Sequence, residues 1–411
     1  MSSRDPRSSI LALRSSLLGL LCLVLLLGGR ASAGTELSVM MGLGEGEWRV
    51  MRERIFPPFE EQHEVKVRAI QAEADQAVKK LVAMHRAGRM RVDLITQDVL
   101  RLSSLIDAGV MRDLSEQREA IPPSALPQLI QVGTFDGALY FSPYRPNVQI
   151  TYYHAEKFAE YGLQPPRTWE ELLAVARRFK EAEGVGRVLL HGSLDVNTSI
   201  HVMEFIWAAG GDPLLLNDAG SVRAFSFLQQ LAPYLAPETR LANWNTTNTF
   251  LATEAVYLAR NWPFGVNLLV QQAGKTQIKA YHGWQGPLRE AHVLGGEVIG
   301  IPRGARHPGP AVEFMRYLMS RPVQETLVTA LGWPSFRTDA YGTLETWQRP
   351  YFAAIQEALR YAVVRPHVTG WAEVDRALVG AFREIVYGGQ PVEPTLARYH
   401  QQLQKARQRL R

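Results

Sequence analysis

Cysteine is almost absent from this sequence: of its 411 residues, Cys22 is the only one. It lies in an apolar stretch from Leu17 to Leu27, close to the N-terminus. If this stretch belongs to a leader that is removed, the rest of the chain forms no disulfide and has no thiol for catalysis. Packing and hydrogen bonds must then hold the fold together.

Long apolar runs are also scarce, and the one near the N-terminus predicts a secretory signal peptide over residues 1–33. Basic residues precede it, and Ala31-Ser32-Ala33 fits the small-residue pattern of a cleavage site. A retained membrane anchor is the alternative, but the run is shorter than the ~20 residues that a spanning helix needs. Lipid attachment at Cys22 is not expected, because Leu21 rather than a small residue precedes it. We therefore expect a periplasmic or extracellular protein.

An excess of charge of one sign is missing as well. The formal net charge is +5, but residues 1–33 contain four arginines and one aspartate, which leaves +2 for the remainder. No run of lysine and arginine with interleaved aromatic residues is present, so the sequence gives no indication of nucleic-acid binding.

Motifs of common enzymes are absent too. The sequence has no Gly-x-Ser-x-Gly, no His-Glu-x-x-His and no phosphate-binding loop, and its 10 histidines show no metal-ligand spacing. We expect neither a cofactor nor a metal, and no ATP site. A glycoside hydrolase remains an alternative, because it needs two carboxylates across one cleft. Candidates for that pair are Glu45, Glu47, Asp98 and Glu297.

What the sequence does contain is the pattern of an α/β protein large enough for two lobes. Strands are predicted at 37–41, 65–70 and 92–96, with helical periodicity between them. The segment from Leu294 to Tyr341 predicts a strand, a turn rich in proline and glycine, and two helices, the second ending at Gly332.

The motifs in this segment and elsewhere resemble those of family 1 extracellular solute-binding proteins of ABC importers, above all the trehalose/maltose-binding proteins. The resemblance covers about residues 35–405. The matching motifs are Gly295-Gly296, Ile299-Gly300-Ile301, Leu331-Gly332-Trp333, Arg337-Thr338-Asp339-Ala340-Tyr341, 135–144 and Arg260-Asn261-Trp262-Pro263. The resemblance implies a monomeric, non-enzymatic protein that binds a disaccharide such as trehalose or maltose and delivers it to permease subunits in the membrane.

The resemblance also implies the two-lobed, type II periplasmic-binding-protein fold, in which the chain crosses between the lobes three times. We expect these crossings near 144–148, 293–297 and 332–336. The predicted division is 1–33 for the signal peptide, 34–145 plus 297–332 for lobe 1, and 146–296 plus 333–411 for lobe 2. Sugar would bind between the lobes, which would close by a hinge motion.

The family motif assigns Trp262 to stacking on a sugar ring, since a pyranose has an apolar face that an indole can cover. A buried core indole is the alternative. Glu45 and Glu47 lie in an acidic loop and suit sugar hydroxyls, unless the loop is simply solvated. Asp98 follows a predicted strand, where ligands collect in α/β sheets, or caps the next helix.

Two positions depart from the family pattern. Asn147 stands where the trehalose/maltose binders have an acidic residue, and Glu297 stands where they have a tryptophan. Arg365 matches an arginine that reaches the sugar, with a role at a helix C-terminus as the alternative. The complete set of predicted ligand-binding residues is Glu45, Glu47, Asp98, Asn147, Trp262, Gly296, Glu297, Trp333 and Arg365.

A binder of another solute, such as a glycerol phosphate, is the remaining alternative. It would need cations in the cleft, for which Arg145, Arg337 and Arg365 are candidates.

Overall fold

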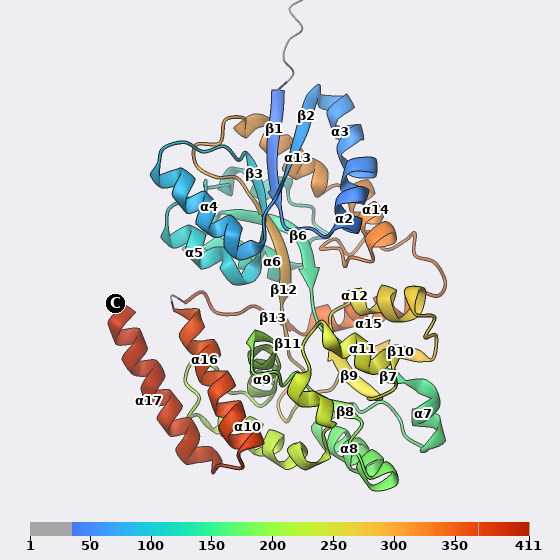
Figure 1. The fold of residues 1–411 in the computed structure, drawn as a ribbon. Coiled ribbons are helices and arrows are strands. Elements are labelled where there is room, and N and C mark those ends of the chain that lie inside the picture. Colours follow the sequence, from blue (N-terminus) through green and yellow to red (C-terminus); the bar gives the residue numbers. More distant parts are fainter. Residues whose placement is uncertain (1–34, 369, 411) are drawn as a thin grey trace, which may run out of the picture.

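The computed structural model describes residues 35–368 and 370–410, which form an upper and a lower lobe (Figure 1). The predicted signal peptide, including Cys22, lies outside the described residues. Within these ranges no helix has the length and apolar character needed to cross a membrane. The α/β, two-lobed fold that the sequence predicts is confirmed.

The upper lobe is built on a five-stranded sheet in the order β2-β1-β3-β12-β6. The first three strands are parallel, and the last two run antiparallel to their neighbours. The strands are β1 (Thr35–Met41), β2 (Val65–Gln71), β3 (Leu94–Asp98), β6 (Phe141–Asn147) and β12 (Gly295–Gly300). The surrounding helices are α2 (Glu45–Val50), α3 (Phe56–His63), α4 (Ala74–Arg86), α5 (Leu102–Asp107), α6 (Pro127–Val132), α13 (Pro308–Leu318) and α14 (Arg321–Leu331).

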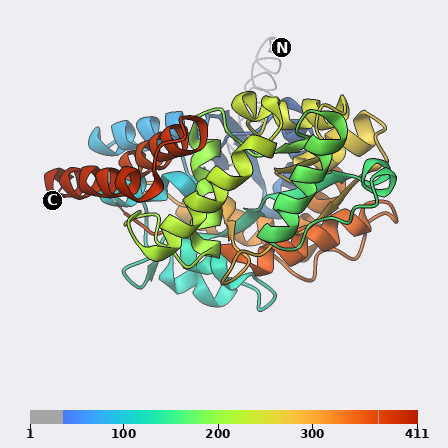
Figure 2. The same ribbon diagram turned by 90° about the horizontal axis from the view of Figure 1, so that it is seen from below.

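The lower lobe has a four-stranded sheet in the order β10-β7-β9-β8. Its strands are β7 (Ile150–His154), β8 (Val188–Leu189), β9 (Leu258–Asn261) and β10 (Ile278–Tyr281). Helices cover this sheet, and the last helix extends outward to the C-terminus (Figure 2). They are α7 (Ala155–Glu160), α8 (Trp169–Glu183), α9 (Val196–Ala208), α10 (Ala219–Leu231), α11 (Thr246–Ala252), α12 (Phe264–Val266), α15 (Arg349–Arg360), α16 (Trp371–Phe382) and α17 (Val392–Leu410).

Three segments connect the lobes. The chain passes from β6 to β7 at 148–149, and from β11 (His292–Val293) to β12 at Leu294. β11 pairs in parallel with β13 (Ala362–Val363), so the chain that follows α15 lies beside the crossing at Leu294.

The third crossing lies beyond the expected 332–336. The backbone N–H of Leu126 donates to the carbonyl of Phe336 over 2.9 Å, and that of Thr338 donates to Ser124 over 3.0 Å. These bonds attach 335–340 to the upper lobe before the chain reaches α15. We propose that the upper lobe comprises 35–147 plus 295–341, and that the lower lobe comprises 150–293 plus the described chain from α15 onward. The predicted boundaries at 145 and 297 therefore shift by two residues, because β6 and β12 lie in the upper sheet, and 333–341 belongs to the upper lobe.

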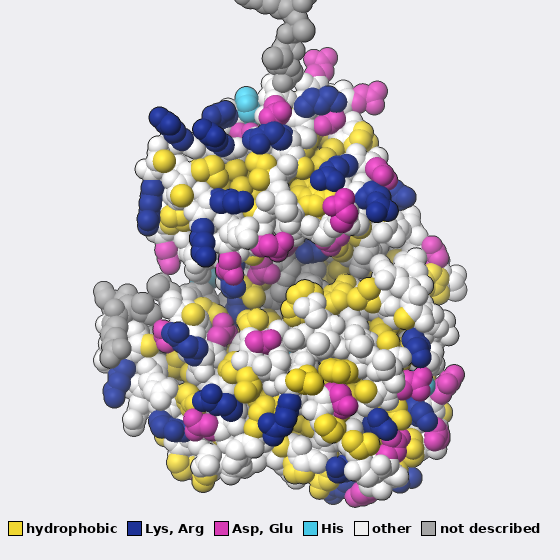
Figure 3. Space-filling view, viewed as in Figure 1, with side chains coloured by type: hydrophobic (Ala, Val, Ile, Leu, Met, Phe, Trp, Pro, Cys, Tyr) yellow, Lys and Arg dark blue, Asp and Glu magenta, His cyan; other side chains and the backbone are white. Residues whose placement is uncertain are grey.

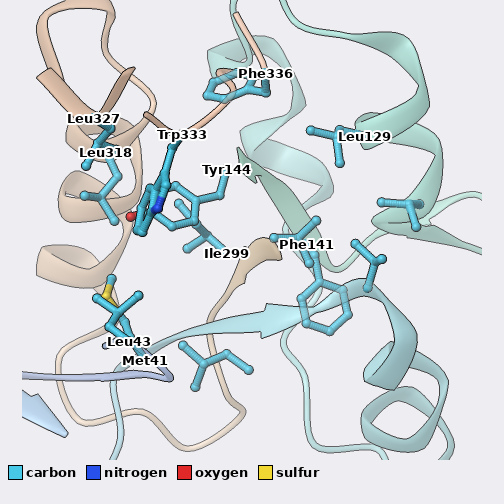
Figure 4. Packing of buried hydrophobic residues seen from close by; sticks show 14 of the residues in the cluster. Met41, Leu43, Leu129, Phe141, Tyr144, Ile299, Leu318, Leu327, Trp333 and Phe336 are labelled. Carbon is cyan, nitrogen blue, oxygen red and sulfur yellow. The ribbon is translucent and has the colours of Figure 1, made fainter. Parts of the chain in front are cut away.

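The core of the upper lobe reaches the edge of the cleft, where Trp333 packs against Tyr144 (Figure 4). Their ring centroids are 6.1 Å apart at an interplanar angle of 85°. Gly332 ends α14 with φ of 67°, as the sequence predicts, because glycine adopts positive φ without a steric cost. This turn directs Trp333 from the helix end back toward the sheet.

Candidate functional site

A cavity of about 580 Å³ lies between the lobes, beside the crossing strands. The space-filling view shows the molecule hollowed at this level, with hydrophobic side chains along the lower edge (Figure 3). The lining residues are Glu47, Asp98, Leu100, Arg145, Asn147, Val196, Asn197, Ile200, Trp244, Trp262, Pro263, Phe264, Val293, Gly295, Gly296, Leu331, Gly332, Trp333 and Pro334. A larger depression of about 710 Å³ lies near the C-terminus, but no aromatic side chain lines it.

The cavity brings together six of the nine residues predicted from the sequence. They are Glu47, Asp98, Asn147, Trp262, Gly296 and Trp333. Glu45 is exposed and faces Arg52 at 3.8 Å. Glu297 is held by Arg145, behind the lining residues, and Arg365 lines a neighbouring cavity.

Glu47, Arg145 and Trp333 form one bonded group in the upper wall. Oε1 of Glu47 accepts a hydrogen bond from the indole N–H of Trp333 at 2.9 Å and from Arg145 at 3.4 Å. Oε2 accepts from the backbone N–H of Gly44, the N-cap residue, at 2.7 Å, which satisfies a free donor at the start of α2. The guanidinium carbon of Arg145 lies 4.1 Å from the Trp333 ring centroid. These contacts fix the carboxylate and the indole before any ligand arrives.

Glu297 belongs to the same group, although the carboxylate does not line the cavity. Its Oε1 lies 3.4 Å from Nη2 of Arg145, and its Oε2 has no hydrogen-bond partner in the described part of the chain. Burial raises the pKa of Glu297, and the positive charge of Arg145 opposes that rise. Glu297 stands where the trehalose/maltose binders have a tryptophan. Its carboxylate therefore forms an ion pair with Arg145 in place of an aromatic surface.

Asp98 lines the cavity and also caps the turn that follows its strand. It ends β3 and lines the cavity, and its Oδ1 accepts a hydrogen bond of 2.7 Å from the N–H of Leu100. Burial raises the pKa of Asp98, while the Leu100 hydrogen bond and the nearby arginines lower it.

The lower wall is built around the end of β9. Asn261 is fully buried, and its side-chain N–H group donates to Asn248 at 2.9 Å and to the carbonyl of Trp244 at 3.1 Å. Its carbonyl oxygen accepts from the backbone N–H of Trp262 at 2.9 Å. One amide therefore positions both tryptophans of this wall.

Trp262 is only partly buried and lines the cavity, so it differs from the core indole considered as the alternative. A Cβ atom on Gly295 would lie 3.0 Å from its ring, so a glycine at the crossing leaves space for the indole. Trp244, Asn197 and Phe264 also line the cavity but were missed in the sequence. No local sequence pattern marks Trp244 as a wall residue.

Arg365 lies in an adjoining cavity of about 460 Å³, which shares Leu100 with the first. Its guanidinium carbon is 4.7 Å from the centroid of Trp371. Burial lowers the pKa of Arg365 to about 10, an effect that nearby Asp375 opposes. Nη1 of Arg365 is buried without a hydrogen-bond partner among the described residues.

Two carboxylates of the upper lobe share one cation. Glu47 and Glu297 each place a carboxylate oxygen 3.4 Å from a guanidinium nitrogen of Arg145, so the three side chains form one ion-paired group. Within 35–368 and 370–410, no group of three or more histidine, cysteine, aspartate or glutamate side chains is placed to hold a metal ion.

The chain matches a known protein family over most of its length. A model described as bacterial extracellular solute-binding protein matches residues 55–354. A probable ABC transporter-binding protein of Deinococcus radiodurans is 25% identical over 342 residues, which are 75% of this chain and 80% of the relative. An uncharacterized ABC transporter extracellular-binding protein of Pyrococcus horikoshii is 20% identical over 69% of this chain and 67% of its own.

Solved structures share the fold. A maltose-bound MalE3 of T. maritima superposes with a TM-score of 0.75 at 20% identity, over 90% of this chain and 100% of the other. A cyclic alpha-maltosyl-1,6-maltose binding protein of Arthrobacter globiformis gives 0.77 at 19% identity, over 90% and 98%. At these identities the likeness establishes the two-lobed architecture and leaves the ligand open.

Proposed function

The chain belongs to the bacterial extracellular solute-binding proteins, and we propose that its solute is a sugar, in particular a disaccharide such as trehalose or maltose. The ligand is held in the cavity between the lobes, and the loaded protein delivers it to the permease of an ABC importer. The names of the D. radiodurans and P. horikoshii relatives support the transporter assignment. In this proposal the protein is a secreted monomer, has no catalytic activity and relies on a separate ATPase.

The observation that carries the sugar assignment is the combination of indoles and carboxylates in one cavity. Trp262 and Trp244 come from the lower lobe and Trp333 from the upper, while Glu47 and Asp98 lie in the upper wall. Indole faces cover the C–H faces of sugar rings, and carboxylates accept hydrogen bonds from hydroxyl groups.

Closure follows from contact with both lobes. A ligand that touches Trp262 below and Glu47 above interacts more strongly with the closed form than with the open form, and this difference shifts the population. The crossings at 148–149 and Leu294 are short enough to act as hinges.

The phosphate alternative has less support. Arg145 is neutralised by two glutamates, and Arg337 pairs with Asp339 at 2.7 Å. Among the three candidate arginines, Nε of Arg145 and Nη1 of Arg365 are buried without a hydrogen-bond partner in the described structure. Arg365 lies outside the main cavity, and the charge of Arg145 is already shared with two glutamates. A phosphate group in that cavity would instead face Glu47 and Asp98.

Thermal unfolding in a panel of disaccharides tests the proposal. A sugar that binds only the native protein stabilises it by ~2.7 kcal/mol at a hundredfold excess over Kd. We expect a rise in melting temperature with trehalose or maltose and none with glycerol phosphate. A shift with glycerol phosphate alone would favour the other solute class, and turnover of a chromogenic glycoside would indicate a hydrolase.

A further inference from the structure

Exposed large hydrophobic side chains gather at one edge of the cavity. Eight such residues occur in the described parts of the chain, and all of them lie between positions 194 and 361. Four come from two adjacent segments, 194–196 at the start of α9 and 241–244 before α11, and we call these four the apolar rim. They are Leu194 (37% exposed), Val196 (39%), Leu241 (66%) and Trp244 (44%).

The two segments form one surface. The backbone N–H groups of Gly192 and Ser193 both donate to the carbonyl of Ala242, at 3.2 and 3.3 Å. Trp244 packs edge-on against Phe264 with centroids 5.9 Å apart, and its backbone is held by Asn261. The rim is therefore a fixed surface and not a pair of loose loops.

The apolar rim is continuous with the cavity. Val196 and Trp244 line the cavity and are also exposed, whereas Leu194 and Leu241 belong to the same two segments but are not among the lining residues. In Figure 3 the lower edge of the hollow shows hydrophobic side chains, and charged side chains lie above it. Asp195, the one charged residue in the loop 193–196, accepts a hydrogen bond from the N–H of Asn197 and caps α9.

A sugar alone does not account for this surface. Valine and leucine side chains offer no hydrogen bonds to sugar hydroxyls. Contact with them removes water from the hydroxyl groups without replacing its hydrogen bonds, which is unfavourable. Exposed leucines are common singly, but a cluster that continues out of a binding cavity marks contact with an apolar group.

We propose that the ligand is a sugar carrying an apolar substituent, an alkyl or aryl glycoside, whose substituent lies on the apolar rim. This rests on the proposed function, because the sugar part occupies the cavity between Trp262 and Glu47. Burying the substituent against Trp244, Val196 and the outer leucines adds the apolar contact that a plain disaccharide lacks.

The test compares methyl and octyl maltoside, with the corresponding glucosides, by titration calorimetry below the micelle concentration. We expect octyl maltoside to bind about tenfold or more tightly than methyl maltoside, allowing for the entropy lost by the chain. Leu194 and Leu241 lie outside the cavity lining. Leu194→Ser and Leu241→Ser should therefore lower the ratio of octyl to methyl maltoside affinity and leave the affinity for methyl maltoside unchanged. Leu288→Ser changes a residue that is 69% exposed elsewhere on the surface, and it should keep the full ratio.

Each outcome is decisive. Equal affinities for the methyl and octyl compounds would overturn this inference and leave the sugar site intact. An octyl preference that survives in Leu194→Ser and Leu241→Ser as fully as in Leu288→Ser would also overturn it, and the rim would then be a surface for a protein partner. If neither kind of glycoside binds, the proposed function and this inference fall together.

Discussion

Trp333 donates its indole N–H to Oε1 of Glu47 over 2.9 Å, a contact between residues 286 positions apart in the sequence. It joins α2 to the second residue after α14. Through it, the hydrogen bond from the Gly44 N–H to Glu47 and the turn at Gly332 set the position of one wall of the cavity.

Glu47→Gln should weaken sugar binding by about tenfold or more, because a hydrogen bond to a charged group contributes roughly 1.5–3 kcal/mol. Glutamine keeps a carbonyl oxygen for the hydrogen bond from Gly44, so α2 remains capped. Glu45→Gln is the matched control, since Glu45 lies two residues away and faces Arg52 instead of the cavity. Calorimetry should show a loss for the first variant only; equal affinities for both variants would remove Glu47 from the site.

Gly296→Ala should lower the free energy of unfolding by at least about 2 kcal/mol. Gly296 has φ of 111°, and a Cβ atom there would lie 2.1 Å from the carbonyl oxygen of Arg145 on β6. The comparison is Gly46→Ala in α2, where no atom lies within 4 Å of the new Cβ. Because alanine favours a helix over glycine, that change should be neutral or stabilising by up to about 1 kcal/mol. Urea denaturation of both variants measures the difference, and a neutral Gly296→Ala would contradict the tight crossing.

Stability should decrease as the pH falls from 6.5 toward 4. Burial lowers the pKa of His191 to about 3 and that of His292 to about 4, with Arg260 acting in the same direction. An unfolded histidine has a pKa near 6.5, so below that pH the unfolded chain binds more protons and is favoured. Burial also lowers the pKa of His201, which adds to the trend. Burial raises the pKa of Glu204 to about 7 and raises those of Asp98 and Glu297, and these three carboxyl groups oppose the trend.

His191→Phe isolates one part of this pH dependence. Both ring nitrogens of His191 are buried without partners in the described structure, and its ring stacks on His201 at 4.4 Å, so an aromatic replacement loses no hydrogen bond. The slope of the unfolding free energy between pH 6 and 4.5 should fall by up to about 1.4 kcal/mol per pH unit, the value for one proton. An unchanged slope in denaturant titrations at several pH values would show that His191 is not the group concerned.

The sequence predicts those parts of the site that depend on local pattern. Gly332 ends its helix as expected, and the motif around Trp262 marks a residue that lines the cavity. Contacts between distant segments leave no local signal. Arg145 lies between Glu47 and Glu297 only because β6 and β12 pair in the folded sheet. The third crossing lies later in the chain than predicted because 335–340 forms hydrogen bonds with 124–126.

Trp244 illustrates the same limit. Its place in the lower wall depends on a hydrogen bond from Asn261, which lies 17 residues later and on another element. No periodicity in 243–247 distinguishes a residue that lines the cavity from one on the outer surface of the protein.

Titration of the wild-type protein and of Trp262→Ala with maltose and trehalose tests the central claim most directly. The account predicts one bound sugar per wild-type chain, and a loss of ~1–3 kcal/mol in the variant, on the scale of a lost stacking surface. Trp347→Ala, which changes a tryptophan outside the cavity lining, should bind as the wild type does. Equal affinity of Trp262→Ala and wild type, or no binding of either sugar, would contradict the claim that a sugar is held between the lobes.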